Sequence, residues 1–70
     1  MLTQQVKSSK IKEVGYDSSS MILRVTFIRD GVYEYYAVPN RIVEEFHNAD
    51  SLGLFFKRFI KDKYRYVRLG

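Results

Sequence analysis

Residues 23–38 read LRVTFIRDGVYEYYAV, and this stretch decides the fold. Leu23, Val25 and Phe27 alternate with other side chains at the period of two that is typical of a half-buried strand. Asp30-Gly31 is a tight-turn signal, and it lies between two runs rich in residues that favour strands. The stretch therefore predicts an antiparallel hairpin, and the remaining elements can be placed outward from it in both directions.

The turn of this hairpin decides which face of the sheet carries Tyr33 and Tyr35. A two-residue turn would pair Phe27 with Glu34 and would leave both tyrosines on the outer face. A three-residue loop, Arg29–Gly31, would instead pair Phe27 with Tyr33 and would put both tyrosines in the core, because a shift of one residue exchanges the faces of a strand. We expect the three-residue loop, since it keeps Glu34 out of the core.

The segments on either side of the hairpin predict one further strand and a first helix. Residues 10–17 predict a strand, and three consecutive strands with short links favour an antiparallel meander. Pro39 has no backbone N–H to donate, so it ends the last strand of the hairpin and suits the start of a helix. Ile42, Val43 and Phe46 then recur at helical spacing on one face of that helix.

A second helix is expected over about residues 52–61, with Ser51 as its N-cap. Phe55, Phe59 and Ile60 recur at helical spacing and are expected in the core. The predicted fold is α+β, with a three-stranded antiparallel sheet in β-β-β-α-α order, two helices on one face and room for a short C-terminal strand. The predicted organisation is a flexible N-terminus at residues 1–9, a single domain at 10–64 and a basic C-terminal extension at 65–70.

The composition predicts a non-catalytic protein without a metal or cofactor. The 70 residues include no cysteine and one histidine, His47, and the four glycines do not form a phosphate-binding loop. A domain of this length has little room for a deep pocket of the usual ~300 Å³ or more. No apolar run approaches the roughly 20 residues of a membrane span. Since the absence of cysteine fits a reducing compartment, we expect a cytoplasmic protein.

Positive charge is concentrated in the last part of the chain. Residues 1–56 hold six basic and seven acidic residues, a net charge of −1, whereas residues 57–70 hold six basic and one acidic residue, a net charge of +5. Tyrosines are interleaved with these cations, a combination that suits the stacking of bases and the binding of phosphates. The candidate nucleic-acid-binding residues are Lys57, Arg58, Lys61, Lys63, Tyr64, Arg65, Tyr66 and Arg68.

Several short pieces of the chain, in this order and spacing, resemble a known family. They include Val14-Gly15-Tyr16-Asp17 and the motif residues Tyr33, Tyr35, Val38, Pro39, Ser51 and Gly53. The set resembles the KTSC domain, a short module named after the C-terminus of some lysyl-tRNA synthetases and found in small bacterial and phage proteins. The resemblance implies a binding module with RNA as a suggested ligand, and it implies a structural role for the motif residues and no catalytic ones.

Two functions therefore remain open at this stage. The first is a small module that binds RNA or other single-stranded nucleic acid through its basic, tyrosine-containing C-terminal segment. The second is a protein-interaction adaptor that uses the open face of the sheet or an edge strand. Salt dependence separates them, because counterion release makes phosphate binding fall steeply with salt.

Overall fold

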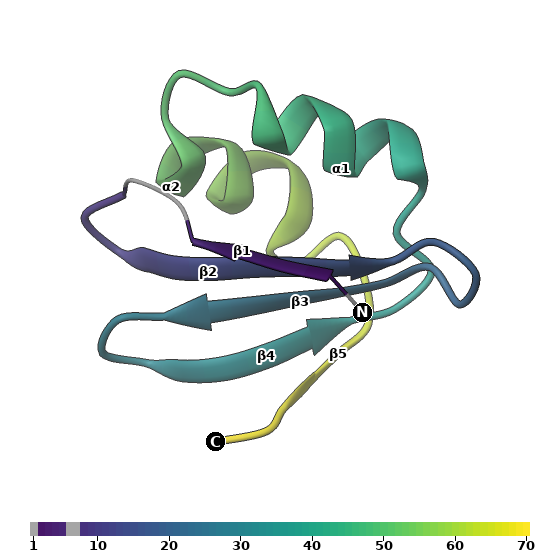
Figure 1. Cartoon of the computed structure of the whole chain (residues 1–70), viewed down its shortest axis with the longest axis horizontal. Coiled ribbons are helices and arrows are strands. Elements are labelled where there is room, and N and C mark those ends of the chain that lie inside the picture. The colour runs from purple at the N-terminus through teal and green to yellow at the C-terminus, as the bar shows by residue number, and fades with distance from the viewer. Residues whose placement is uncertain (1, 6–7) are drawn as a thin grey trace.

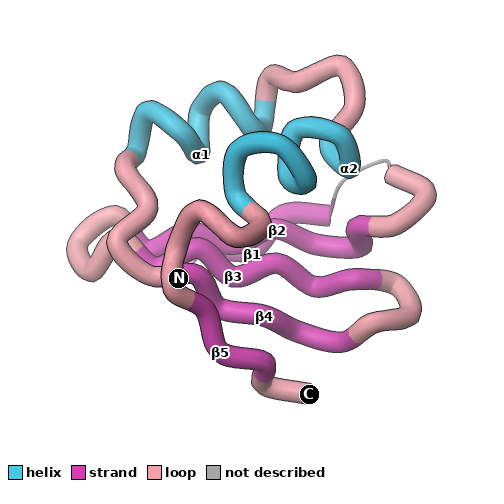
Figure 2. Tube along the Cα trace, turned by 180° about the vertical axis from the view of Figure 1, so that it is seen from behind, coloured by secondary structure: helices cyan, strands magenta, loops and turns pink. Residues whose placement is uncertain are grey.

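A five-stranded antiparallel sheet forms one layer of the fold, and the helices cover one of its faces (Figures 1 and 2). The computed structural model describes residues 2–5 and 8–70. The strands lie side by side in chain order and are β1 (Leu2–Gln5), β2 (Ile11–Asp17), β3 (Ile22–Phe27), β4 (Gly31–Tyr35) and β5 (Tyr66–Arg68). The predicted α+β class with two helices on one face is confirmed, and the C-terminal strand that it allowed is β5.

The first edge of the sheet is formed by Leu2–Gln5, which lie within the segment 1–9 whose flexibility stays a prediction. Strand β1 pairs antiparallel with β2, so that Leu2 faces Tyr16 and Gln5 faces Glu13. Strand pairing uses backbone groups, and a polar sequence can therefore supply an edge strand without an apolar pattern to reveal it. Residues 1, 6 and 7 lie outside the described residues, and the domain limits 10–64 and 65–70 stay a prediction.

The hairpin of β3 and β4 places Tyr33 and Tyr35 on the helix-covered face, as expected from the three-residue loop. The pairing itself differs from the prediction, because Val25 faces Tyr33 and Phe27 faces Gly31. The predicted register is therefore wrong by two residues. A shift of two keeps every side chain on its face, so the apolar pattern could not detect it. Gly31 accommodates the observed register with a φ of +92°, a backbone conformation that glycine adopts readily.

The opposite face of the sheet is not covered by the helices (Figure 1). Arg24 and Glu34 face each other across β3 and β4, and their side chains form an ion pair with a distance of 2.7 Å between Nη2 and Oε2. The Tyr36 hydroxyl also donates to Glu34. These polar contacts are consistent with a face that is in contact with solvent.

Helix α1 (Asn40–His47) begins directly after Pro39 and buries Val43 and Phe46. Helix α2 (Leu52–Phe55) begins after Ser51, whose hydroxyl accepts a hydrogen bond from the Leu54 N–H, as expected for an N-cap. The chain continues without a break into a π-helix, η1 (Phe56–Ile60). In that turn the N–H of Lys61 donates to the carbonyl oxygen of Phe56, five residues earlier.

The π-turn changes which side of the second helix enters the core. Phe56 and Ile60 are buried, whereas Phe59 is 50% exposed and packs beside Phe55 with ring centroids 4.8 Å apart. The prediction that Phe59 is a core residue is therefore wrong. A π-helix has more residues in each turn than the α-helix assumed from the sequence, so side chains near its end rotate away from the expected face. The core also contains Ile11, Val14, Leu23, Val25, Tyr35, Val38, Val43 and Phe46.

Candidate nucleic-acid interface

An open groove of about 500 Å³ lies where η1, the loop between β3 and β4, and β5 meet. Its size differs from the expectation that the chain has little room for a pocket. We call this feature the aromatic groove, because its lining includes five aromatic side chains: Phe27, Tyr33, Tyr35, Phe56 and Tyr66. The groove is possible in so short a chain because β5 extends the sheet past the helices that cover it (Figure 2).

Three tyrosines from two neighbouring strands form one side of the aromatic groove. Tyr66 on β5 faces Tyr35 on β4, and their rings are stacked with centroids 5.3 Å apart. The ring of Tyr33 is 5.8 Å from that of Tyr66 and tilted by 47°. Tyr35 is 3% exposed and Tyr66 is 51% exposed, so Tyr66 is the member of this group that presents a large aromatic surface to solvent.

Tyr35, the buried tyrosine of the groove, carries no phenolate charge at neutral pH. Burial raises the pKa of Tyr35 to about 12, with smaller contributions in the same direction from the phenols of Tyr66 and Tyr33 and from Asp62 and Asp30. The Tyr33 hydroxyl donates to the Asp30 carboxylate at 3.3 Å. Tyr35 therefore adds no negative charge that would repel an anionic ligand.

Cations from separate parts of the chain surround the aromatic groove. Lys57 and Lys61 come from η1 and the residue after it, Lys10 precedes β2, and Arg29 lies in the loop between β3 and β4. We call these four residues the cationic rim. Two acidic residues, Asp30 and Asp62, also line the groove, so its charged lining residues give a net charge of +2.

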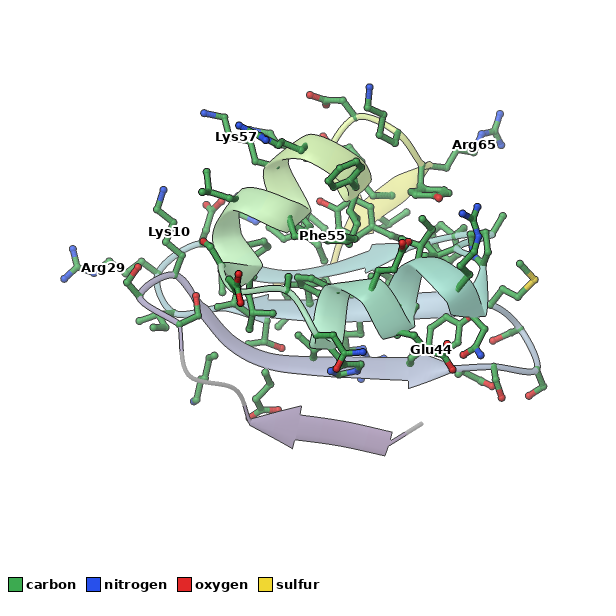
Figure 3. All side chains as sticks on the ribbon, turned by 90° about the horizontal axis from the view of Figure 1, so that it is seen from above. Lys10, Arg29, Glu44, Phe55, Lys57 and Arg65 are labelled. Atoms are coloured by element: carbon green, nitrogen blue, oxygen red, sulfur yellow. The ribbon has the colours of Figure 1, made fainter. Side chains whose placement is uncertain are left out.

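The fold brings the ends of distant segments together to make this rim. The Ile28 N–H donates to the Lys10 carbonyl oxygen at 2.9 Å, which joins the start of β2 to the loop that contains Arg29. Figure 3 shows Lys10, Arg29 and Lys57 at one end of the molecule and Arg65 at the other. The positive charge of the groove is therefore not a property of the C-terminal segment alone.

Three of the eight residues predicted to bind nucleic acid line the aromatic groove: Lys57, Lys61 and Tyr66. The other five do not line it. Tyr64 is partly buried against the core, and the Arg68 guanidinium carbon lies over the ring of Tyr33 at 5.9 Å from its centroid. Arg58, Lys63 and Arg65 are exposed.

Sequence reasoning missed two members of the cationic rim, Lys10 and Arg29. They lie far from the basic segment in sequence, and only the pairing of β2 with β3 brings them to the groove. Sequence reasoning favoured a structural role for Tyr33 and Tyr35, and both line the groove. The strand alternation that placed them on the Phe27 face was a signal for this proximity.

Of the remaining motif residues, Val38 has structural contacts, whereas Gly53 lines the aromatic groove. Val38 is fully buried, its N–H donates to the Met21 carbonyl oxygen, and its own carbonyl oxygen accepts a hydrogen bond of 2.6 Å from the Tyr16 hydroxyl. Gly53 has no neighbouring atom within 4 Å of the position of an added Cβ, so close packing does not explain a glycine there.

No group of three or more potential metal ligands occurs within residues 2–5 and 8–70. In the same part of the chain, none of the helices has the length and apolar character needed to cross a membrane. The predictions of a non-catalytic protein and of a cytoplasmic location stay predictions.

Comparison with known proteins links this geometry to a family. The family profile described as the KTSC domain matches residues 7–64. A crystal structure of a KTSC domain protein from Yersinia pestis is similar, with a TM-score of 0.96 and 38% identity over 99% of this chain and 97% of that one. An uncharacterized protein from Stutzerimonas stutzeri is 40% identical over 65 residues, which cover 91% of this chain and 92% of that protein.

A second kind of relative is much longer than this chain. A lysine–tRNA ligase from Trichormus variabilis is 43% identical over 64 residues, which cover 91% of this chain and 11% of the ligase. The chain therefore spans only about a tenth of the length of this relative. The similarity concerns a segment of the ligase and not the enzyme as a whole.

Proposed function

This chain belongs to the KTSC domain family, and from that premise we propose that it is a small module that binds single-stranded nucleic acid, RNA foremost. The binding surface comprises the aromatic groove and the basic C-terminal segment beside it. The single observation that carries the proposal is that the half-exposed Tyr66 lines the same groove as Lys57 and Lys61. Exposed aromatic rings stack on bases, and neighbouring cations contact phosphates.

Charge and family context support the same function. Residues 57–70 carry a net charge of +5, and a polyanion would meet this segment from several directions because its side chains are mostly exposed. The similar segment in a lysine–tRNA ligase belongs to a protein whose name includes an RNA substrate. RNA is therefore the first nucleic acid to test.

The experiment is a titration of the whole chain against a labelled RNA strand of mixed sequence, followed by fluorescence anisotropy at low and moderate salt. We expect affinity that falls steeply with salt, because each contacted phosphate contributes about 0.7 to the logarithmic slope for a single strand. Replacing Lys61, Lys63 and Arg65 together by glutamine should flatten the slope by about two units if all three contact phosphate. The absence of binding at low salt would contradict the proposed function.

A control variant removes charge elsewhere on the surface. Lys12 on β2 and Arg41 on α1 are exposed and do not line the aromatic groove. Replacing both by glutamine should leave the salt slope of RNA binding unchanged. An equal loss with this control would show that net charge alone attracts the RNA.

The second candidate function is the protein-interaction adaptor, which a different observation favours. Strand β5 is at an edge of the sheet, and the side chains of Val67 and Leu69 are 48% and 50% exposed. Such an edge can add a strand from a partner through backbone hydrogen bonds. This function predicts no RNA binding at low salt and partner affinity with little salt dependence.

A further inference from the structure

We propose that the aromatic groove is a subsite for one unpaired nucleotide within a strand. Its base stacks on the free face of Tyr66, and the phosphates on either side of that nucleotide contact the cationic rim. This inference rests on the proposed function and deepens it, because it names the part of the nucleic acid that the groove takes. It also assigns Lys10 and Arg29, which lie outside the basic C-terminal segment, to the binding site.

The groove has the size of a site for a small ligand. Its volume of about 500 Å³ lies within the range of about 300–1,000 Å³ that is typical of such sites. It is bounded by η1 on one side and by β5 and the loop between β3 and β4 on the others. An open groove of this extent suits one nucleotide and does not provide a long track for successive bases.

Only one tyrosine ring of the groove is available for stacking. The exposed area of Tyr66 must lie on the face and edges that Tyr35 does not cover, since these two rings are stacked. Tyr35 itself is buried. The ring of Tyr33 is less accessible, because it packs edge-to-face with the ring of Phe27, with centroids 5.5 Å apart, and because the Arg68 guanidinium lies over it. Because only the ring of Tyr66 is available, we expect one stacked base for each domain.

The cationic rim is free to bind phosphate. In the described part of the chain, the one ion pair between side chains is that of Arg24 and Glu34, so no member of the rim has a carboxylate oxygen within salt-bridge distance. Lys57 lies in η1 and Lys61 is the residue directly after it, and Figure 3 shows Lys57 at the same end of the molecule as Lys10 and Arg29. Asp30 and Asp62 would repel phosphate, so the phosphates are expected at the lysines and the arginine.

An unpaired nucleotide is favoured over a base pair for an energetic reason. A base inside a duplex is stacked on both faces and paired with one partner base, and its removal into a pocket costs a few kcal/mol. The groove holds one base and offers no surface for its pairing partner. A single strand reaches the groove without this cost, so duplex of the same length should bind more weakly.

The test uses an RNA trinucleotide, because its central base has a phosphate on each side. The affinity of each strand is divided by the number of positions on it at which the domain can bind. This affinity per register should reach its plateau at the trinucleotide and stay constant in longer strands. An abasic centre or the variant Tyr66→Ala should each weaken binding by roughly tenfold or more, the effect of losing one stacked base. Titration followed by NMR should shift the backbone amides of Lys10, Arg29, Lys57 and Tyr66.

The matched charge variants separate the groove from the general surface. Lys57→Gln with Lys61→Gln should weaken trinucleotide binding and lower the salt slope by about 1.4, whereas Lys12→Gln with Arg41→Gln should change neither. Equal losses from the two double variants would overturn the subsite, as would tight duplex binding or affinity per register that rises beyond the trinucleotide. In each of these cases RNA binding itself survives. If no strand of any length binds at low salt, both the subsite and the proposed function are wrong.

Discussion

Truncation of Phe56 should destabilise the protein far more than truncation of Phe59, although both are phenylalanines of the same helix. Phe56 is 7% exposed. Its ring packs edge-to-face with the rings of Phe27 and Tyr35, with centroid distances of 5.1 Å and 5.4 Å. Replacing a buried phenylalanine by alanine costs about 3–5 kcal/mol. A domain of 70 residues has a total stability of roughly 4–10 kcal/mol, so Phe56→Ala could remove most of it.

Phe59 is half-exposed, and its aromatic contact is with Phe55. Full burial of a phenylalanine side chain contributes about 1.5–3 kcal/mol, so half burial predicts a loss of only about 1 kcal/mol for Phe59→Ala. Urea denaturation followed by circular dichroism measures both free energies of unfolding. If Phe56→Ala does not fold, Phe56→Leu gives a smaller and measurable loss. A larger loss for Phe59→Ala than for Phe56→Ala would refute the π-turn and restore the face expected from α-helical spacing.

Three further predictions concern single residues. Because burial raises the pKa of Tyr35 to about 12, the unfolded chain loses this proton at lower pH than the folded chain, and the free energy of unfolding should fall between about pH 10 and 12. In urea denaturation, Tyr35→Phe should reduce this fall by about 1 kcal/mol at about pH 11, and an unchanged fall would contradict the raised pKa of Tyr35. Gly31→Ala should destabilise the fold by at least about 1 kcal/mol, since φ is +92° and the added Cβ would lie 1.6 Å from the Gly70 carbonyl oxygen. The variant should also increase hydrogen exchange of the backbone amides in β5, and an exchange rate equal to that of the wild type would be evidence against this contact. Tyr16→Phe should lower stability by about 0.5–1.5 kcal/mol through the loss of the hydrogen bond to Val38, and thermal melting would reveal an unaffected protein if the bond contributes nothing.

The elements of the fold could be predicted where local patterns decide them. The alternation of Leu23, Val25 and Phe27 located β3, and the chemistry of Pro39 and Ser51 located the starts of the two helices. The side of the sheet that carries the tyrosines was also predictable, because keeping Glu34 out of the core selects one parity of the hairpin.

Features that depend on strand pairing or on an irregular helix turn could not be predicted from local sequence patterns. Residues Leu2–Gln5 have no apolar alternation, and their strand is specified by the free backbone edge of β2. The π-turn after Phe55 is a departure from regular spacing, so a helical pattern read at 3.6 residues for each turn misplaced Phe59. Lys10 and Arg29 reach the candidate site only because β2 and β3 pair.

The connection between β4 and β5 has a consequence for the order of folding. Each of the strands β1 to β4 pairs with the neighbour that precedes or follows it after a short link, so these contacts have low sequence separation. Strand β5 pairs with β4 only after residues 36–65, including every helix, have crossed the sheet. Closing the longer loop costs more chain entropy, and contacts of this kind form late in folding. We therefore expect β5 to dock last and to open first, which means that Tyr66 joins the groove at the final step of folding and that a ligand stacked on it would hold the last strand in place.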